Sequence, residues 1–168
     1  KAGAMLRRAR EAAGVTTQQL GAAIDLSDPA LLERAESGKV ALPFEVVLRL
    51  ATAVVLRFKH ALACPRPSEY SPNIQPMIPV PGHASFPSGH STESHAAAAV
   101  LSALARQAAG SPLHVQLMRM AGRITDNRTV AGLHFPADNA AGQALGLAIG
   151  DYFVGLAKGS GTAAQPAP

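Results

Sequence analysis

The sequence predicts an all-α fold, a helical bundle preceded by a small segment of short helices. Hydrophobic residues make up 48% of the 168 residues, but aromatic residues only 4%, and Trp is absent. The core must therefore be built from Ala, Leu and Val, which suit closely packed helices better than a β-sandwich. In the clearest helical segment, apolar residues recur at helical spacing; they are Val46, Val47, Leu50, Ala51 and Val54.

The first third of the chain reads as several short helices. Thr16 or Thr17 can cap a helix over residues 18–24, because a hydroxyl accepts from the free N–H groups of a first turn. Pro29 suits the first position of a following helix over residues 30–37.

A longer helix begins at Pro43 and has no clear stop before Lys59. Seven prolines then fall within residues 64–87, a density that we expect to exclude any regular helix. Loops of this length in compact domains usually serve function. Three more helices are expected, over about residues 88–108, from Ser111, and from Pro136 to about Ala157.

These elements predict a helical segment of residues 1–55, a domain of residues 56–158 and a disordered tail of residues 159–168. No transmembrane span is expected, because residues 96–105 are too few and residues 140–157 are interrupted by Gly, Gln and Asp. The first residue is Lys, as in a fragment or a processed form, and no apolar stretch follows the basic start, so no signal peptide is visible.

Three short segments carry groups suited to a tetrahedral oxyanion. They are Lys59 with Arg66-Pro67, then Pro87-Ser88-Gly89-His90, then Arg128 with His134 and Asp138. An Arg side chain binds two phosphate oxygens at once through its planar fork. Ser88 and Gly89 lie where a loop enters a helix, and such a terminus attracts anions through its free N–H groups. The net charge of +4 fits an anionic ligand without requiring nucleic acid.

Two histidines suit a two-step phosphoryl transfer, in which one imidazole attacks phosphorus and the other protonates the leaving oxygen. They are His90 and His134. Asp138 follows His134 by four residues, so on a helix that starts near residue 135 it lies one turn away and can orient the imidazole.

The remaining histidines lack such support. His83 lies in the Pro-rich loop, where an ordinary loop role is favoured over lining the mouth of the site, and His95 is expected to pack in the core. No zinc site is expected, because Cys64 is the only cysteine and no His pair has metal-ligand spacing with a carboxylate.

The three segments resemble the motifs of the type-2 phosphatidic acid phosphatase superfamily, which also contains bacterial acid phosphatases and vanadium-dependent haloperoxidases. Lys-x6-Arg-Pro, Pro-Ser-Gly-His and Arg-x5-His-x3-Asp all match, with Asn127 where Ser is usual. The resemblance covers about residues 52–157 and implies a helical bundle of the acid phosphatase/haloperoxidase type.

By that resemblance, His134 is the nucleophile that forms a phosphohistidine, His90 the general acid and Asp138 the orienting carboxylate. The phosphate cradle consists of Lys59, Arg66, Ser88, Gly89 and Arg128. The resemblance implies a phosphatase that needs no metal or other cofactor and acts on phosphate monoesters, with small phosphorylated molecules and lipid phosphates both open as substrates. In the haloperoxidase branch the same cradle would hold vanadate.

The first part of the chain carries a second pattern of residues, formed by Leu6-Arg7, Arg10, Gly14, Thr16, Gln19-Leu20, Glu36-x-Gly38, Pro43 and Leu50-Ala51. By this pattern residues 1–55 resemble a Cro/repressor type of helix-turn-helix domain, with residues 29–37 as the recognition helix. Asp25 stands where Gly is usual at the turn, and the recognition helix carries more acidic than basic residues, which phosphates repel. The sequence therefore leaves open whether residues 1–55 bind DNA. The compartment is unknown, with the cytoplasm slightly favoured over the periplasm.

Three functions remain open from the sequence. The first is a phosphatase and the second a vanadium-dependent haloperoxidase. The third is a DNA-binding regulator with a vestigial phosphatase portion. The short segment before Lys59 also leaves open whether the bundle retains activity.

Overall fold

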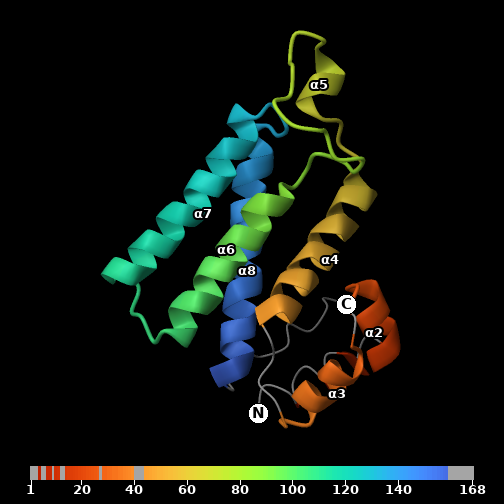
Figure 1. The fold of residues 1–168 in the computed structure, drawn as a ribbon, viewed down its shortest axis with the longest axis vertical. Helices are drawn as coiled ribbons and strands as arrows, with labels where there is room; N and C mark the ends of the chain where they lie inside the picture. The colour runs from red at the N-terminus through yellow and green to blue at the C-terminus, as the bar shows by residue number, and fades with distance from the viewer. Residues whose placement is uncertain are drawn as a thin grey trace, which may run out of the picture. The chain divides into compact units, whose positions relative to one another are not determined.

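The computed structural model describes residues 4, 7–8, 10–11, 14–26, 28–39 and 44–158. Within those ranges all regular structure is helical, as the sequence predicts, and no strand is present. The chain forms two compact units, residues 1–50 with 152–168 and residues 51–151 (Figure 1), and each is described separately below. The tail of residues 159–168, predicted to be disordered, lies outside the described residues.

Helices α2 (Thr17–Ala23) and α3 (Ala30–Glu36) form the first unit. The Thr16 hydroxyl caps α2 by accepting from the backbone N–H of Gln19, whose side chain accepts in turn from the backbone N–H of Thr16. This reciprocal pair satisfies two N–H groups that a helix start would otherwise leave free. Asp25, where Gly is usual, has a φ of 50°, a left-handed conformation that Asp tolerates better than most residues.

Charged side chains of the first unit are largely engaged with one another. Arg10 donates to both carboxylate oxygens of the buried Glu36, over 2.7 and 2.9 Å. On the surface, Arg34 of α3 donates to Asp28 over 2.7 Å. The one basic side chain of the predicted recognition helix is thus paired with the carboxylate of Asp28, which directly precedes that helix.

Four longer helices supply the second unit, and Figure 1 shows α6, α7 and α8 running side by side. They are α4 (Phe44–Leu62, from Ala51 onward), α6 (Gly89–Leu104), α7 (Pro112–Val130) and α8 (Pro136–Lys158, as far as Asp151). The predicted helix over residues 88–108 ends earlier than expected, because Arg106 adopts a left-handed φ of 52° and its N–H turns back to Ala103.

Three glycines of α8 let that helix lie directly against α6. A Cβ added to Gly142 would come within 2.5 Å of the Ser88 carbonyl oxygen, and one added to Gly150 within 2.6 Å of the Ala99 side chain. At Gly146 an added Cβ would collide with the Thr92 carbonyl. We call this stripe of Gly142, Gly146 and Gly150 the glycine seam.

The Pro-rich segment contains a short helix, α5 (Pro67–Tyr70), so the prediction that no regular helix survives there was wrong. Pro67 occupies the first helical position, where no backbone N–H is needed, and the Glu69 carboxylate accepts from the backbone N–H of Arg66 over 2.6 Å. Tyr70 packs edge-on against Phe135, with ring centroids 5.7 Å apart. The segment is therefore held against the start of α8.

No helix in the described part of the chain combines the length and the apolar character that crossing a bilayer requires.

Candidate active site

Lys59 lies near the end of α4 and is only 2% exposed. Its ammonium donates to the backbone carbonyls of Ala84 and Ser85, over 2.7 and 2.8 Å. Burial and, to a smaller extent, the neighbouring Arg66 cation lower the pKa of Lys59 to about 8. A buried cation without a carboxylate partner among its hydrogen bonds is costly, so an anion beside it would be strongly stabilised.

Arg66 precedes α5 and is equally buried. Its guanidinium donates to the carbonyls of His83 and Leu133, each over 3.0 Å, and so joins the loop before α6 to the loop before α8. Another of its nitrogens lies 3.1 Å from Nδ1 of His83. These contacts fix the fork of Arg66 in place before any ligand arrives.

His134 lies in the connection between α7 and α8, and its Nδ1 is 3.2 Å from Oδ2 of Asp138. The contact expected from the four-residue spacing is therefore present. Its other ring nitrogen, Nε2, lies 3.5 Å from Nη1 of Arg66. Because a guanidinium can only donate, we assign the Nδ1–H tautomer, which leaves a lone pair on Nε2. Burial lowers the pKa of His134, against the opposing hydrogen bond to Asp138, and thus favours the neutral ring.

Asp138 is 4% exposed, and burial acts to raise its pKa. Hydrogen bonds from His134, from the Ser85 hydroxyl and from the backbone N–H of Phe135 outweigh burial, and the net pKa is lowered. The carboxylate is therefore ionised at neutral pH and able to hold the Nδ1 proton of His134.

Ser88 and Gly89 lie at the start of α6, as the sequence predicts. The Ser88 N–H donates to the backbone carbonyl of Asp138 over 2.9 Å, which joins the starts of α6 and α8. The Ser88 hydroxyl is fully buried and has no hydrogen-bond partner in the described part of the protein. The first turn of a helix offers further free N–H groups to an anion.

His90 follows on the first turn of α6 and is largely exposed. Partial loss of hydration lowers the pKa of its ring, and the Arg128 guanidinium lowers it further. Arg128, in the last turn of α7, therefore lies close enough to act on His90, and its Nε is a buried donor without a partner among the described residues. A bound phosphate would supply acceptors for Arg128 and would raise the pKa of His90.

A small cavity of about 90 Å³ joins these elements. Its walls include Lys59, Arg66, Gly89, His90 and His134, with Glu93 and His83 beside them. A wider groove of about 970 Å³ adjoins it, since Leu56, Lys59, Pro81 and His83 line both. The cavity is sized for a small ion, and the groove has the volume of pockets that hold a whole organic ligand.

The structure thus brings five of the eight predicted site residues to one cavity. Asp138 lies behind His134, while Ser88 and Arg128 contribute buried donors without partners. Their roles in binding or catalysis stay predictions. Among the described residues, no group of three or more His, Cys, Asp or Glu side chains is arranged to hold a metal ion.

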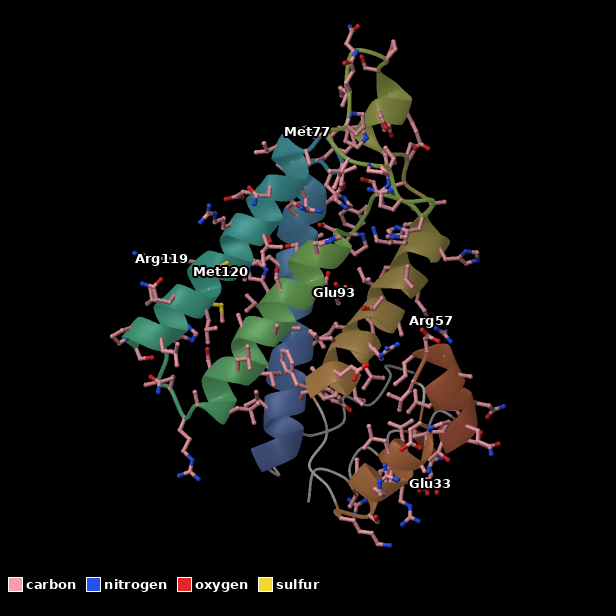
Figure 2. All side chains as sticks on the ribbon, viewed as in Figure 1. Glu33, Arg57, Met77, Glu93, Arg119 and Met120 are labelled. Carbon is pink, nitrogen blue, oxygen red and sulfur yellow. The ribbon has the colours of Figure 1, made fainter. Side chains whose placement is uncertain are left out.

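Sequence reasoning missed Ser85 and Glu93, and it favoured an ordinary loop role for His83, which lines both the cavity and the groove. Ser85 contacts Asp138, and His83 contacts Arg66 rather than serving only its loop. Glu93, labelled in Figure 2 between α6 and α4, accepts from the Thr52 hydroxyl over 2.7 Å. Of these, only Glu93 carried a usable signal, since it follows His90 by one helical turn.

The family model of the PAP2 superfamily matches residues 40–158, which is most of the chain. The chain belongs to the PAP2 superfamily. A helix-turn-helix domain model matches residues 2–57 of this PAP2 chain. Both resemblances drawn from the sequence are confirmed. The two matches share residues 40–57, so the first part of α4 belongs to both.

Two curated relatives resemble this PAP2 chain. Both are named decaprenylphosphoryl-5-phosphoribose phosphatase, from the CDC 1551 / Oshkosh and the ATCC 25618 / H37Rv strains of Mycobacterium tuberculosis. Each is 34% identical over 101 residues, which cover 60% of this chain and 52% of the relative. The chain spans about half the length of the curated relatives it matches.

Proposed function

We propose that residues 51–151 form the catalytic part of a phosphatase that hydrolyses phosphate monoesters through a phosphohistidine at His134. The observation that carries this proposal is the position of His134. Its ring is buried, its Nδ1 lies 3.2 Å from Asp138, and its Nε2 lies 3.5 Å from Arg66. His134, Arg66 and Lys59 line the same cavity. Membership of the PAP2 superfamily and two phosphatase relatives support the same class of reaction.

In the first step, the lone pair on Nε2 of His134 forms a bond to phosphorus while the bond from phosphorus to the ester oxygen breaks. His90 donates a proton to that leaving oxygen. Asp138 accepts the Nδ1 hydrogen bond and stabilises the positive charge that develops on the ring. Lys59 and Arg66 bind the phosphoryl oxygens, where negative charge accumulates.

In the second step, a water molecule attacks phosphorus, and His90, now neutral, takes its proton. The phosphorus–nitrogen bond breaks, its electron pair returns to Nε2 of His134, and inorganic phosphate leaves. His90 thus serves as acid and then as base, and both histidines end in their starting states.

The leaving group would occupy the groove beside the cavity. Apolar residues line part of this groove, Leu56, Ala63, Pro65 and Pro81 among them, beside polar side chains that include His60 and Glu69. This lining and the names of the two relatives support a substrate whose alcohol part carries apolar character, such as a lipid phosphate.

The full chain should release inorganic phosphate from an aryl phosphate, and His134→Ala should abolish that release. Mass spectrometry of protein quenched in base, which preserves phosphohistidine, should show the phosphorylated form in the wild type alone. His114→Ala is the matched control, because His114 bonds to Ser102 and does not line the cavity. Undiminished turnover in His134→Ala would rule out the proposed nucleophile.

Experiments on the same purified protein distinguish a phosphatase from a haloperoxidase. Addition of vanadate should inhibit a phosphatase by occupying the cradle. Halide oxidation after addition of vanadate and peroxide, without any phosphatase activity, would favour the haloperoxidase instead.

The match of residues 2–57 to a helix-turn-helix domain favours DNA binding as a second function. The pairing of Arg34 with Asp28 and the exposed Glu33 of α3 weaken it, because phosphates repel carboxylates. A salt-dependent mobility shift of duplex DNA by the full chain would support it. Absence of binding at low salt would exclude it.

A further inference from the structure

Ser85 lies beside the His134–Asp138 pair, although no motif of the sequence analysis includes it. It lies three residues before Ser88, and its side chain is fully buried. Its hydroxyl donates to Oδ2 of Asp138 over 2.5 Å and lies 3.3 Å from Nδ1 of His134. A buried hydroxyl this close to a buried carboxylate forms a strong, charge-assisted hydrogen bond.

The backbone of Ser85 has separate partners. Its carbonyl accepts from the ammonium of Lys59 over 2.8 Å, and its N–H donates to the carbonyl of Cys64 over 2.8 Å. Cys64 lies two residues before Arg66. One residue thus contacts the buried cation through its backbone and the His134–Asp138 pair through its side chain.

Three donors converge on a single oxygen of Asp138. Oδ2 accepts from the Ser85 hydroxyl, from the backbone N–H of Phe135 over 3.0 Å, and from Nδ1 of His134 over 3.2 Å. The bond to Ser85 is the shortest of the three. It restrains rotation of the carboxylate and draws electron density from the oxygen that holds the imidazole proton.

We infer that Ser85 is a positioning residue for the phosphoryl-transfer step, and that its hydroxyl holds the Asp138 carboxylate in the orientation that aligns His134. The inference rests on the proposed nucleophilic role of His134. The hydroxyl acts on the nucleophile only, because the backbone makes the contact to Lys59. Chemistry and anion binding are therefore separable at this one residue.

Ser85→Ala tests the inference because it removes the hydroxyl and keeps both backbone contacts. We expect kcat to fall about tenfold or more, as when residues that orient a reactive ligand are removed. Inhibition by inorganic phosphate should stay within about twofold, since the cradle is intact. A parallel loss of kcat and of phosphate affinity would overturn the inference in favour of a general structural role, and an unchanged kcat would also overturn it.

The pH profile gives a second, independent readout. With the Ser85 donor gone, the Asp138 oxygen has more charge to offer the imidazolium, so the pKa of His134 should rise. The acidic limb of kcat/KM should then move to higher pH by about half a unit to one unit. An unmoved limb would contradict the inference.

Two further variants keep the test decisive. Ser85→Thr retains a hydroxyl and should recover most of kcat if it folds. Ser102→Ala removes another buried hydroxyl of the same unit, one that contacts His114 and not the cavity, and should leave kcat unchanged.

A readout without turnover separates this inference from the proposed function. The Nδ1 proton of His134 should give a downfield ¹H NMR resonance in the wild type that shifts in Ser85→Ala. If the wild type lacks phosphatase activity but the resonance shifts, the proposed function fails and the positioning contact stands. If the wild type is active and the resonance does not shift, the reverse holds.

Discussion

The two histidines of the cavity differ in nearly every physical respect. His134 is 4% exposed and bonded to a buried carboxylate, whereas His90 is largely exposed on the first turn of α6. Burial lowers the pKa of both rings, but the cation with the largest effect on the pKa differs between them. Lys59 and Arg66 lower that of His134, whereas Arg128 ranks first among the charges that lower that of His90.

This difference matches the demands of the two proposed roles. A nucleophile needs one fixed direction of attack and an unprotonated nitrogen, which burial and Asp138 provide. A general acid must reach leaving groups of differing shape and regain its proton from water, which exposure permits. Similar imidazoles thus become suited to different tasks through their surroundings.

The largest expected effect on kcat comes from a change at Asp138, the partner of the buried His134. Asp138→Asn should lower kcat by about 10⁴-fold, because the amide can donate to Nδ1 and so favour the wrong tautomer of His134. Steady-state kinetics on an aryl phosphate measures it. Asp126→Asn, an exposed acid on α7, is the matched control and should change kcat little. A loss of less than about tenfold would show that Asp138 does not orient the nucleophile.

For the exposed His90, the effect of a substitution on kcat/KM should depend on the leaving group of the substrate. His90→Ala should lower kcat/KM by about 10²–10⁴-fold for an alkyl phosphate, whose leaving oxygen needs a proton. For dinitrophenyl phosphate, whose leaving group departs as an anion, the loss should shrink to about tenfold or less. A series of leaving groups of rising pKa measures this. Equal losses across the series would break the assignment of His90 as the acid.

A smaller, pH-dependent effect tests whether the charged form of Lys59 binds the anion in the cavity that both histidines line. The pKa of Lys59 is lowered to about 8, and a bound phosphate would raise it. Affinity for inorganic phosphate should therefore be full below about pH 8 and fall by up to about tenfold per pH unit above it, until the pKa of the bound form is passed. Inhibition constants for inorganic phosphate, measured between about pH 7 and about pH 10, test this loss of affinity.

Lys59→Arg supplies the control for that pH dependence. An Arg side chain stays protonated throughout this range, so its phosphate affinity should not fall near pH 8. If the wild type also shows no fall, Lys59 does not bind the anion in its charged form.

Most of the fold could be predicted from the sequence, because helix starts follow local rules. Thr16 caps the start of α2 with its hydroxyl, and Pro136 begins α8 because its ring fixes a helical φ. Helix ends were harder to place, since α6 stops at a left-handed Arg106 that no sequence rule would have indicated. The short helix α5 was missed because the density of prolines outweighed the favourable position of Pro67.

The candidate site was predictable where spacing along one helix decides proximity, as for His134 and Asp138. The candidate site was less predictable where loops that are distant in sequence meet. The position of Ser85 beside Asp138 depends on the path of a loop across 53 residues of separation. His83 was assigned an ordinary loop role for the same reason, since nothing local indicates its contact with Arg66.

The glycine seam has a consequence for variation in this protein. α6 begins at Gly89, directly before His90, and α8 begins at Pro136, directly after the His134 loop. The seam sets how closely these two helices approach, and thus, in the proposed reaction, the gap that a phosphorus atom must bridge between the two imidazoles. A methyl group at Gly146, which lies on α8 beyond Asp138 and outside the three motifs, would widen that gap. Sequence changes outside the three motifs can therefore disturb the candidate site while every motif remains intact.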